Sequence, residues 1–250
     1  RSNSGKTLGD LLFVSPSGDD AEISVFRQRS GGSFPPAPDW KGTVPRAGSV
    51  RILDLDGDRR PDVLATHGES ADSFQIRIFL DRGGAFPTDP DQILKISGYG
   101  VQAAAADLDG DGAIELVVTH YSLSELAALK ATVHRTVLVY RRDAERAFQR
   151  SPSSKLDERF SAAEAKALSQ PIIFDADLLG AGRRQALHAD RDGALVAREF
   201  DSSLGLRAEP CFRFVPRRMI LGIDPADLSR DGRTDLVLRH HRSLTVLVSR

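Results

Sequence analysis

Short hydrophobic segments alternate with polar turns along the whole chain. The clearest examples are SVRILDL (49–55), PDVLATH (61–67), FQIRIFL (74–80) and QILKIS (92–97). The third segment alternates apolar and polar residues with a period of two, which is typical of a strand with one buried face. Asp, Gly and Pro, which favour tight turns, lie between the segments. The pattern therefore predicts four short strands in about 50 residues.

This unit recurs, and its most regular feature is a nine-residue loop. We name the copies the first loop (DLDGDRRPD, 54–62), the second loop (DLDGDGAIE, 107–115), the third loop (DLLGAGRRQ, 177–185) and the fourth loop (DLSRDGRTD, 227–235). Four strands in a repeat of about 50 residues are typical of a β-propeller blade. The sequence therefore predicts an all-β protein, a propeller of about five four-stranded blades with incomplete terminal blades. The alternative is a fragment of a larger propeller.

The repeats predict one domain that covers residues 1–250. Its blade units are expected at about 1–46, 47–98, 99–168, 169–217 and 218–250. The third unit is longer because it holds two extra segments, 124–134 and 157–170, with helical spacing of apolar residues. We expect both to be surface insertions, which loops accommodate at small free-energy cost.

Composition narrows the classes of partner. The formal net charge is −1 over 250 residues, which gives no electrostatic reason to expect nucleic acid. No apolar run is long enough to span a membrane, so we expect no membrane insertion. A single cysteine, Cys211, excludes an internal disulfide and a thiolate zinc site. The chain begins with Arg1 and has no secretion signal, so we expect it to be part of a longer parent chain.

The loops predict calcium sites. In a D-x-D-x-D-G-x-x-D loop, the side chains at positions one, three, five and nine and the carbonyl at position seven can surround one ion, and oxygen-only ligands favour calcium. The expected ligands are Asp54, Asp56, Asp58, Arg60 and Asp62 in the first loop, Asp107, Asp109, Asp111, Ala113 and Glu115 in the second, and Asp227, Ser229, Asp231, Arg233 and Asp235 in the fourth. Arg59 replaces the turn glycine of the first loop.

The third loop is expected to bind no ion. It keeps Asp177 but has Leu179, Ala181 and Gln185 at the other side-chain positions. The alternative for every loop is an Asp-rich turn without an ion, because Asp and Gly favour turns by themselves.

These residues resemble a known family. The acidic loop, its repeat of about 50 residues, and a Gly-Gly-x-Phe turn later in the unit (GGSF, 31–34, and GGAF, 83–86) are similar to the FG-GAP and VCBS repeats of integrin-like β-propellers. The resemblance implies a propeller, usually of seven blades, with calcium in loops of one face. It also implies adhesion or recognition of a protein or carbohydrate, in an extracellular, cell-surface or periplasmic location. The chain has about five units, so a fragment of a seven-bladed propeller stays open.

Histidines recur after the loops. His67, His120 and His240 each follow position nine by five residues, and His188 and His241 lie near the corresponding strand ends. One interpretation is that each histidine caps a strand end. The other is a ring of imidazoles that binds a metal or an anionic ligand.

The sequence favours a non-catalytic recognition or scaffold module. No nucleophile motif or phosphate-binding loop is present. The alternative function is a propeller-based lyase or hydrolase with a histidine-lined central site.

Overall fold

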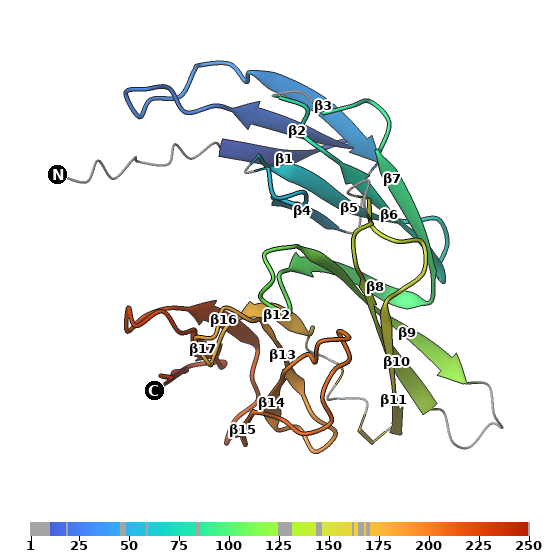
Figure 1. The fold of residues 1–250 in the computed structure, drawn as a ribbon, viewed down its shortest axis with the longest axis vertical. Coiled ribbons are helices and arrows are strands. Elements are labelled where there is room, and N and C mark those ends of the chain that lie inside the picture. The colour runs from blue at the N-terminus through green and yellow to red at the C-terminus, as the bar shows by residue number, and fades with distance from the viewer. Residues whose placement is uncertain are drawn as a thin grey trace. The chain divides into compact units, whose positions relative to one another are not determined.

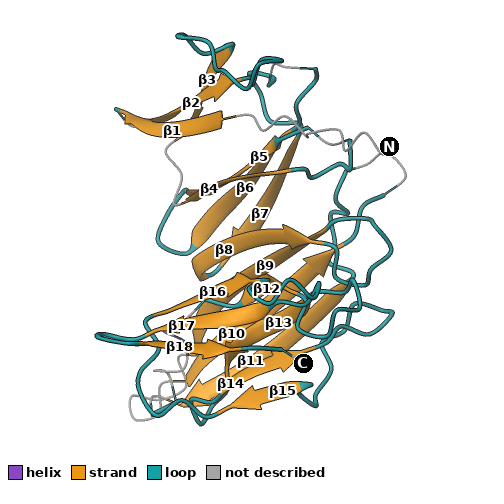
Figure 2. Ribbon diagram, turned by 90° about the vertical axis from the view of Figure 1, so that its left-hand side faces the viewer, coloured by secondary structure: helices purple, strands orange, loops and turns teal. Residues whose placement is uncertain are grey.

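The structure is a computed structural model. It describes residues 11–18, 20–45, 49–58, 60–83, 86–124, 132–143, 147–161, 163–164, 168 and 171–249. Every extended element in these residues is a β-strand, and none of them belongs to an α-helix (Figure 2). The chain divides into two compact units, Arg1–Ser97 and Gly98–Arg250.

The first unit contains two antiparallel sheets with their strands in chain order (Figure 1). One sheet consists of β1 (Leu11–Ser17), β2 (Asp20–Phe26) and β3 (Trp40–Pro45). The other consists of β4 (Ser49–Leu53), β5 (Asp62–Gly68), β6 (Ser73–Phe79) and β7 (Gln92–Ser97). The two sheets pack through buried apolar side chains that include Ile23 of β2 and Val63 of β5.

The second unit contains three antiparallel sheets. The first is formed by β8 (Tyr99–Ala106), β9 (Glu115–Ser124), β10 (Thr132–Tyr140) and β11 (Ser154–Ser161). The next is formed by β12 (Ile173–Ala176), β13 (Gln185–Ala189), β14 (Leu195–Arg198) and β15 (Phe212–Phe214). The last is formed by β16 (Gly222–Ala226), β17 (Asp235–Arg239) and β18 (Leu244–Leu247).

Consecutive sheets of the second unit pack against each other. Val137 of β10 and Phe174 of β12 belong to one buried apolar cluster, and Leu187 of β13 and Leu236 of β17 belong to the next. The first strand of the middle sheet, β12, lies beside the first strands of its neighbours, β8 and β16. The sheets therefore approach most closely along their first strands.

The strands predicted in residues 49–97 are confirmed. β4, β5, β6 and β7 occupy the four predicted segments and form one meander. The first and last sheets have three strands each in the described part of the chain, β1–β3 and β16–β18. The all-β prediction is correct for the described residues.

The expectation that segments 124–134 and 157–170 are surface insertions with helical spacing is wrong where the structure describes them. Residues 157–161 belong to β11, and 132–134 belong to β10. The remainder of the first segment, 125–131, and most of 162–170 lie outside the described residues. β11 pairs with β10 along its length, so pairing in the sheet overrides the local helix propensity of this sequence.

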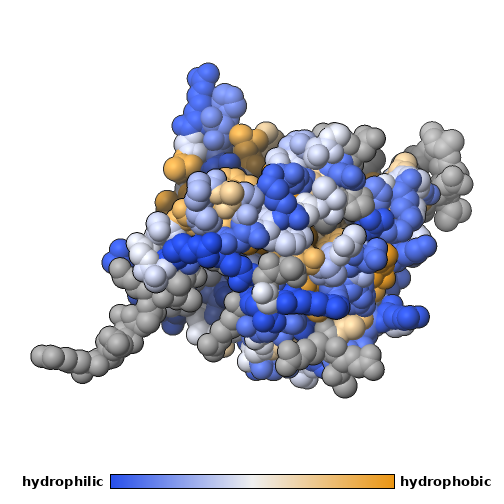
Figure 3. Space-filling view, turned by 90° about the horizontal axis from the view of Figure 1, so that it is seen from above, coloured by the Kyte–Doolittle hydropathy of each residue, from blue (hydrophilic) through white to orange (hydrophobic). Residues whose placement is uncertain are grey.

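The surface mixes polar and apolar side chains. In the view of Figure 3, hydrophilic residues cover most of the visible face and hydrophobic residues form separate patches. No helix among the described residues is long and apolar enough to cross a membrane.

Candidate functional site

The four loops occupy equivalent places in four sheets. Each one joins the first strand of a sheet to the second, and position nine is the first residue of that second strand. At position four, glycine has a positive φ in the first three loops, for example 79° at Gly110. Arg230 takes this position in the fourth loop with a φ of 62°, a conformation that is strained for a residue with a side chain. Three loops therefore have a relaxed turn, and the fourth has a strained one.

The side chain at position nine anchors its loop from inside the protein. Its oxygen accepts a hydrogen bond from the backbone N–H of position two in all four loops. The pairs are Leu55–Asp62 at 2.6 Å, Leu108–Glu115 at 3.0 Å, Leu178–Gln185 at 2.7 Å and Leu228–Asp235 at 2.9 Å. All four anchors are buried, with at most 2% of their surface exposed. An amide serves this purpose as well as a carboxylate, so position nine is first a structural residue.

The aspartate at position one also supports every loop. Asp107 accepts hydrogen bonds from Gly110 N and Gly112 N at 2.7 and 3.0 Å. Asp177 makes the same kind of contact in the third loop, with Ala181 N at 3.2 Å and Gly182 N at 2.8 Å. The third loop therefore keeps the scaffold of the second, although it lacks the carboxylates at positions three and five.

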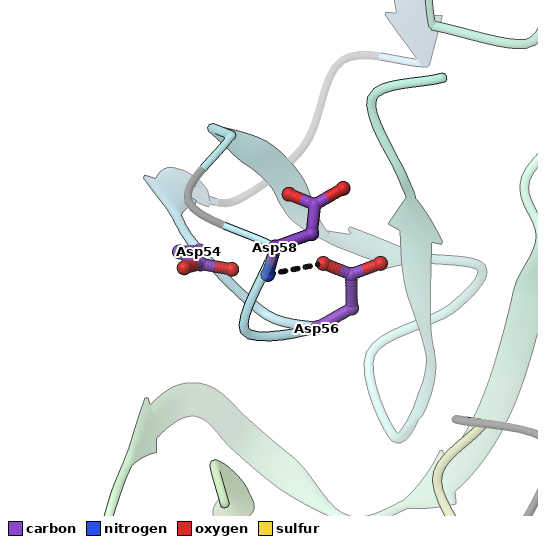
Figure 4. A group of neighbouring side chains, drawn as sticks. All are labelled: Asp54, Asp56 and Asp58. Carbon is purple, nitrogen blue, oxygen red and sulfur yellow. Dashed lines mark hydrogen bonds between the residues drawn. The ribbon is translucent and has the colours of Figure 1, made fainter. Parts of the chain in front are cut away.

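In two loops the carboxylates gather. Oxygen atoms of Asp54, Asp56 and Asp58 all lie within 4.8 Å of one another in the first loop. Figure 4 shows these three side chains on the loop between β4 and β5, with Asp58 N donating to Asp56 Oδ1 at 3.0 Å. Negative charges at this separation repel, and a cation relieves the repulsion.

The second loop gathers a different set. Oxygens of Asp107, Asp109 and Glu115 lie within 4.8 Å of one another, whereas Asp111 is not in the group. Asp62 is likewise absent from the group in the first loop. The structure thus brings together three of the four predicted carboxylates in each loop, and an all-oxygen donor set fits a hard cation such as calcium.

The other two loops gather no such set. No three acidic side chains of the third or fourth loop, all of which the structure describes, meet this distance criterion. In the fourth loop, Asp235 is occupied by four hydrogen bonds from Leu228 N, Ser229 N, Ser249 N and Ser249 Oγ. The bond from Ser249 N is the main cause that lowers the pKa of Asp235.

Arginines already neutralise part of the gathered charge. Arg141 reaches Asp109 Oδ2 at 3.0 Å, and Arg60 forms an ion pair with Asp58. Both arginine side chains are at least 40% exposed, so they can move away when a cation binds. Arg59, at position six of the first loop, lies outside the described residues.

Residues 54–118 match the family model described as an FG-GAP-like repeat. This segment runs from the start of the first loop into β9, just beyond the second loop. It is an FG-GAP-like repeat. The match confirms the resemblance for this segment, about a quarter of the chain, and both gathering loops lie inside it. A search of curated proteins found no match to the chain.

Burial changes the acidity of the anchors in the FG-GAP-like repeat. It raises the pKa of Glu115 to about 7 and that of Asp62 to about 6. The neighbouring carboxylates, among them Asp109 and Asp111 for Glu115, raise these values further. In the absence of a cation, Glu115 is therefore partly protonated near neutral pH, and a bound cation would favour its charged form.

The histidines do not occupy equivalent environments. His240 supports the capping interpretation, because Nδ1 donates to the Met219 carbonyl at 2.9 Å and Nε2 accepts from Thr245 Oγ1 at 2.9 Å. His241 is exposed, and His120 lies in the middle of β9 rather than at a strand end.

His120 and His67 also lie in different environments. Burial is the main cause that lowers the pKa of His120, and the positive charge of Lys155 lowers it further. His67 belongs to the first unit, at the penultimate position of β5. Within residues 98–249, no group of three metal-ligand side chains in the described part of the chain includes a histidine.

His188 belongs to a buried cluster that the sequence did not predict. Its Nδ1 lies 3.1 Å from a guanidinium nitrogen of Arg135, which is fully buried and also paired with Glu158 at 2.6 Å. The Arg135 guanidinium also lies over the ring of Phe160, 5.0 Å from its centre. Burial, with the positive charge of Arg135, lowers the pKa of His188 to about 4. This histidine is neutral at physiological pH and joins two sheets.

Proposed function

We propose that the chain is a calcium-stabilised, non-catalytic recognition module. The observation that carries this proposal is the contrast between the second and third loops. Both are held by position one and position nine, so the loop folds without carboxylates at positions three and five. Asp109 and Asp111 are therefore not required for the turn, and their repulsion is explained if they help to hold a cation.

The cation would be held by the gathered carboxylates of the FG-GAP-like repeat. Asp54, Asp56 and Asp58 would bind it in the first loop. Asp107, Asp109 and Glu115 would bind it in the second. Calcium there would supply charge neutralisation and a link between loop residues, and hence stability rather than chemistry. The fourth loop, whose expected ligands are Asp227, Ser229, Asp231, Arg233 and Asp235, is proposed as a weaker site because its carboxylates do not gather.

A calcium titration tests this proposal directly. Ions that bind only the folded state stabilise it by mass action. With dissociation constants of about 10⁻⁴ to 10⁻³ M, millimolar calcium would contribute about 0.4 to 1.4 kcal/mol per site. We expect a higher Tm in calcium than in EDTA. Identical melting curves in the two buffers would remove calcium from the proposal.

The proposed architecture is a single β-propeller whose blades are the five sheets. The proposal is supported by the close approach of β8, β12 and β16 and by the apolar packing between consecutive sheets of each unit. A closed ring of 250 residues should have a radius of gyration of about 18 Å. Small-angle scattering measures this quantity, and a clearly larger value would favour an open arrangement.

The proposed partner is a protein or a carbohydrate outside the cell or at its surface. FG-GAP repeats are typically extracellular or surface modules, and residues 54–118 are such a repeat. A glycan and protein binding screen, run in calcium and in EDTA, tests both the partner and its dependence on the ion.

A further inference from the structure

A cleft lies at the end of the last sheet that is opposite the fourth loop. One wall comes from residues 214–221, which lead from β15 into β16, and the other from the turn 240–243 between β17 and β18. Two cavities of about 370 and 250 Å³ share Arg218, His240 and Ser243 as lining residues. We call this surface the basic cleft.

The basic cleft concentrates positive charge. Its lining includes Arg217, Arg218 and Arg242 and contains no Asp or Glu. Arg217 and Arg242 form no ion pair with any residue that the structure describes, and Arg218 donates to Ser243 Oγ at 2.9 Å. Three uncompensated guanidiniums on one surface create a positive potential that attracts anions.

Nearby arginines outside the cleft behave differently. Arg239 pairs with Asp224 at 2.7 Å, and Arg213 forms an ion pair with Asp192. Acidic partners are thus present next to the cleft but do not reach into it. The strand β17 separates the cleft from the fourth loop by five residues, or about 15 Å. At this distance the loop carboxylates are largely screened from the cleft by salt.

The walls of the basic cleft are tied together. His240 joins them through its bonds to the Met219 carbonyl and to Thr245 Oγ1, both 2.9 Å long. The backbone adds Leu221 N to Arg239 O at 2.7 Å and closes the turn from His240 N to Ser243 O at 2.9 Å. A site that is held in place before binding loses less conformational entropy when a ligand arrives.

We propose that the basic cleft binds a ligand that carries a phosphate or sulfate ester. Guanidinium groups form bidentate, charge-assisted hydrogen bonds with such oxyanions, and several guanidiniums suit a group with more than one charged oxygen. Apolar side chains, among them Val215, Met219 and Leu244, line the same cavities and would contact the uncharged body of the ligand. The inference rests on the proposed recognition function but not on calcium.

The test uses the whole chain and isothermal titration calorimetry with three probes. The probes are a sulfated oligosaccharide, a phosphorylated monosaccharide and a carboxylated oligosaccharide without either ester. The test variant is Arg217→Gln with Arg242→Gln, which leaves the Arg218–Ser243 contact in place. The matched control is Arg150→Gln with Arg159→Gln, since both are exposed and removing them changes the net charge equally.

We expect the parent to bind the sulfated or the phosphorylated probe, and the one that binds identifies the source of the oxyanion. The cleft variant should lose at least tenfold in affinity because it lacks two charge-assisted contacts, whereas the control should change less than twofold. An equal loss in both variants, binding of the carboxylated probe alone, or no binding by the parent would each overturn the proposal.

The same samples separate this inference from the proposed function. Each protein is also melted in calcium and in EDTA. A calcium-dependent rise in Tm without probe binding would refute only the basic cleft. Probe binding that depends on Arg217 and Arg242, without any effect of calcium on Tm, would refute only the calcium-stabilised part of the proposed function.

Discussion

The second and third loops share one hydrogen-bonded scaffold, but they differ in charge at positions three and five. Both begin with an aspartate that accepts hydrogen bonds from the turn, and both end with a buried oxygen that accepts from position two. The second loop has Asp109 and Asp111 at positions three and five, where the third loop has Leu179 and Ala181. The comparison teaches that the residues that fold the loop can be separated from those that could bind an ion.

The largest expected effect comes from removing the shared anchor. Gln185→Ala leaves the buried N–H of Leu178 without its acceptor and opens a small cavity, so we expect a loss of about 1 to 3 kcal/mol in the free energy of unfolding. Denaturant unfolding measures this change. Leu179→Ala, at an exposed position of the same loop, is the control and should have a small effect. Equal stability of the two variants would show that position nine is not an anchor.

The next effect concerns calcium affinity. Asp109→Ala removes one gathered carboxylate from the second loop, so this site should lose most of its stabilisation by millimolar calcium, about 0.4 to 1.4 kcal/mol. Leu179→Ala, at the matching position of the third loop, should leave calcium binding unchanged. Calorimetric titration of both variants checks the difference. If the two titrate calcium alike, the assignment of position three as a ligand is wrong.

A pH effect should appear in the second loop but not in the third. Calcium binding needs charged Glu115, whose pKa is about 7 without the ion, so affinity should fall as the pH decreases from 8 to 6. In EDTA, the stability of the folded protein changes with pH in the opposite direction to the calcium affinity. The folded protein holds this proton more tightly than the unfolded chain does, so the contribution of Glu115 to stability is present at low pH and is lost as the pH rises through 7.

The variant Glu115→Gln gives the second loop the anchor of the third. Its amide oxygen can still accept from Leu108 N, so the loop should fold, and the pH dependence that Glu115 causes should disappear. Melting and calcium titrations at pH 6, 7 and 8 make the comparison. A variant that keeps the parental pH profile would place the titrating group elsewhere.

The smallest effect is a gain of binding. Leu179→Asp together with Ala181→Asp places carboxylates on a scaffold that already resembles the second loop, so one additional weak calcium site should appear in the stoichiometry. Leu179→Asn with Ala181→Asn is the control without charge. Failure of the acidic variant to bind, although it stays folded, would show that the shared scaffold is not sufficient.

The strands and loops could largely be predicted because their signals are local. Apolar segments and turn residues located β4 to β7 in the first unit. The D-x-D-x-D spacing located the two loops that gather carboxylates. The strand β11 was missed, although Leu156, Glu158 and Phe160 alternate with more exposed residues at a period of two. Helix-favouring residues that follow this segment concealed that signal.

The sequence by itself determined the repeat, the strand segments and the acidic loops, because each depends on residues that are neighbours along the chain. Tertiary structure decided which side chains form contacts with residues outside their own strand or turn. Only in the folded chain does the buried Gln185 side chain accept a hydrogen bond from Leu178 N. Folding also brings Arg135 to His188 across two sheets, and His240 to the Met219 carbonyl beside the basic cleft. These contacts join residues from different strands or loops, and their geometry arises only when the sheets form and pack.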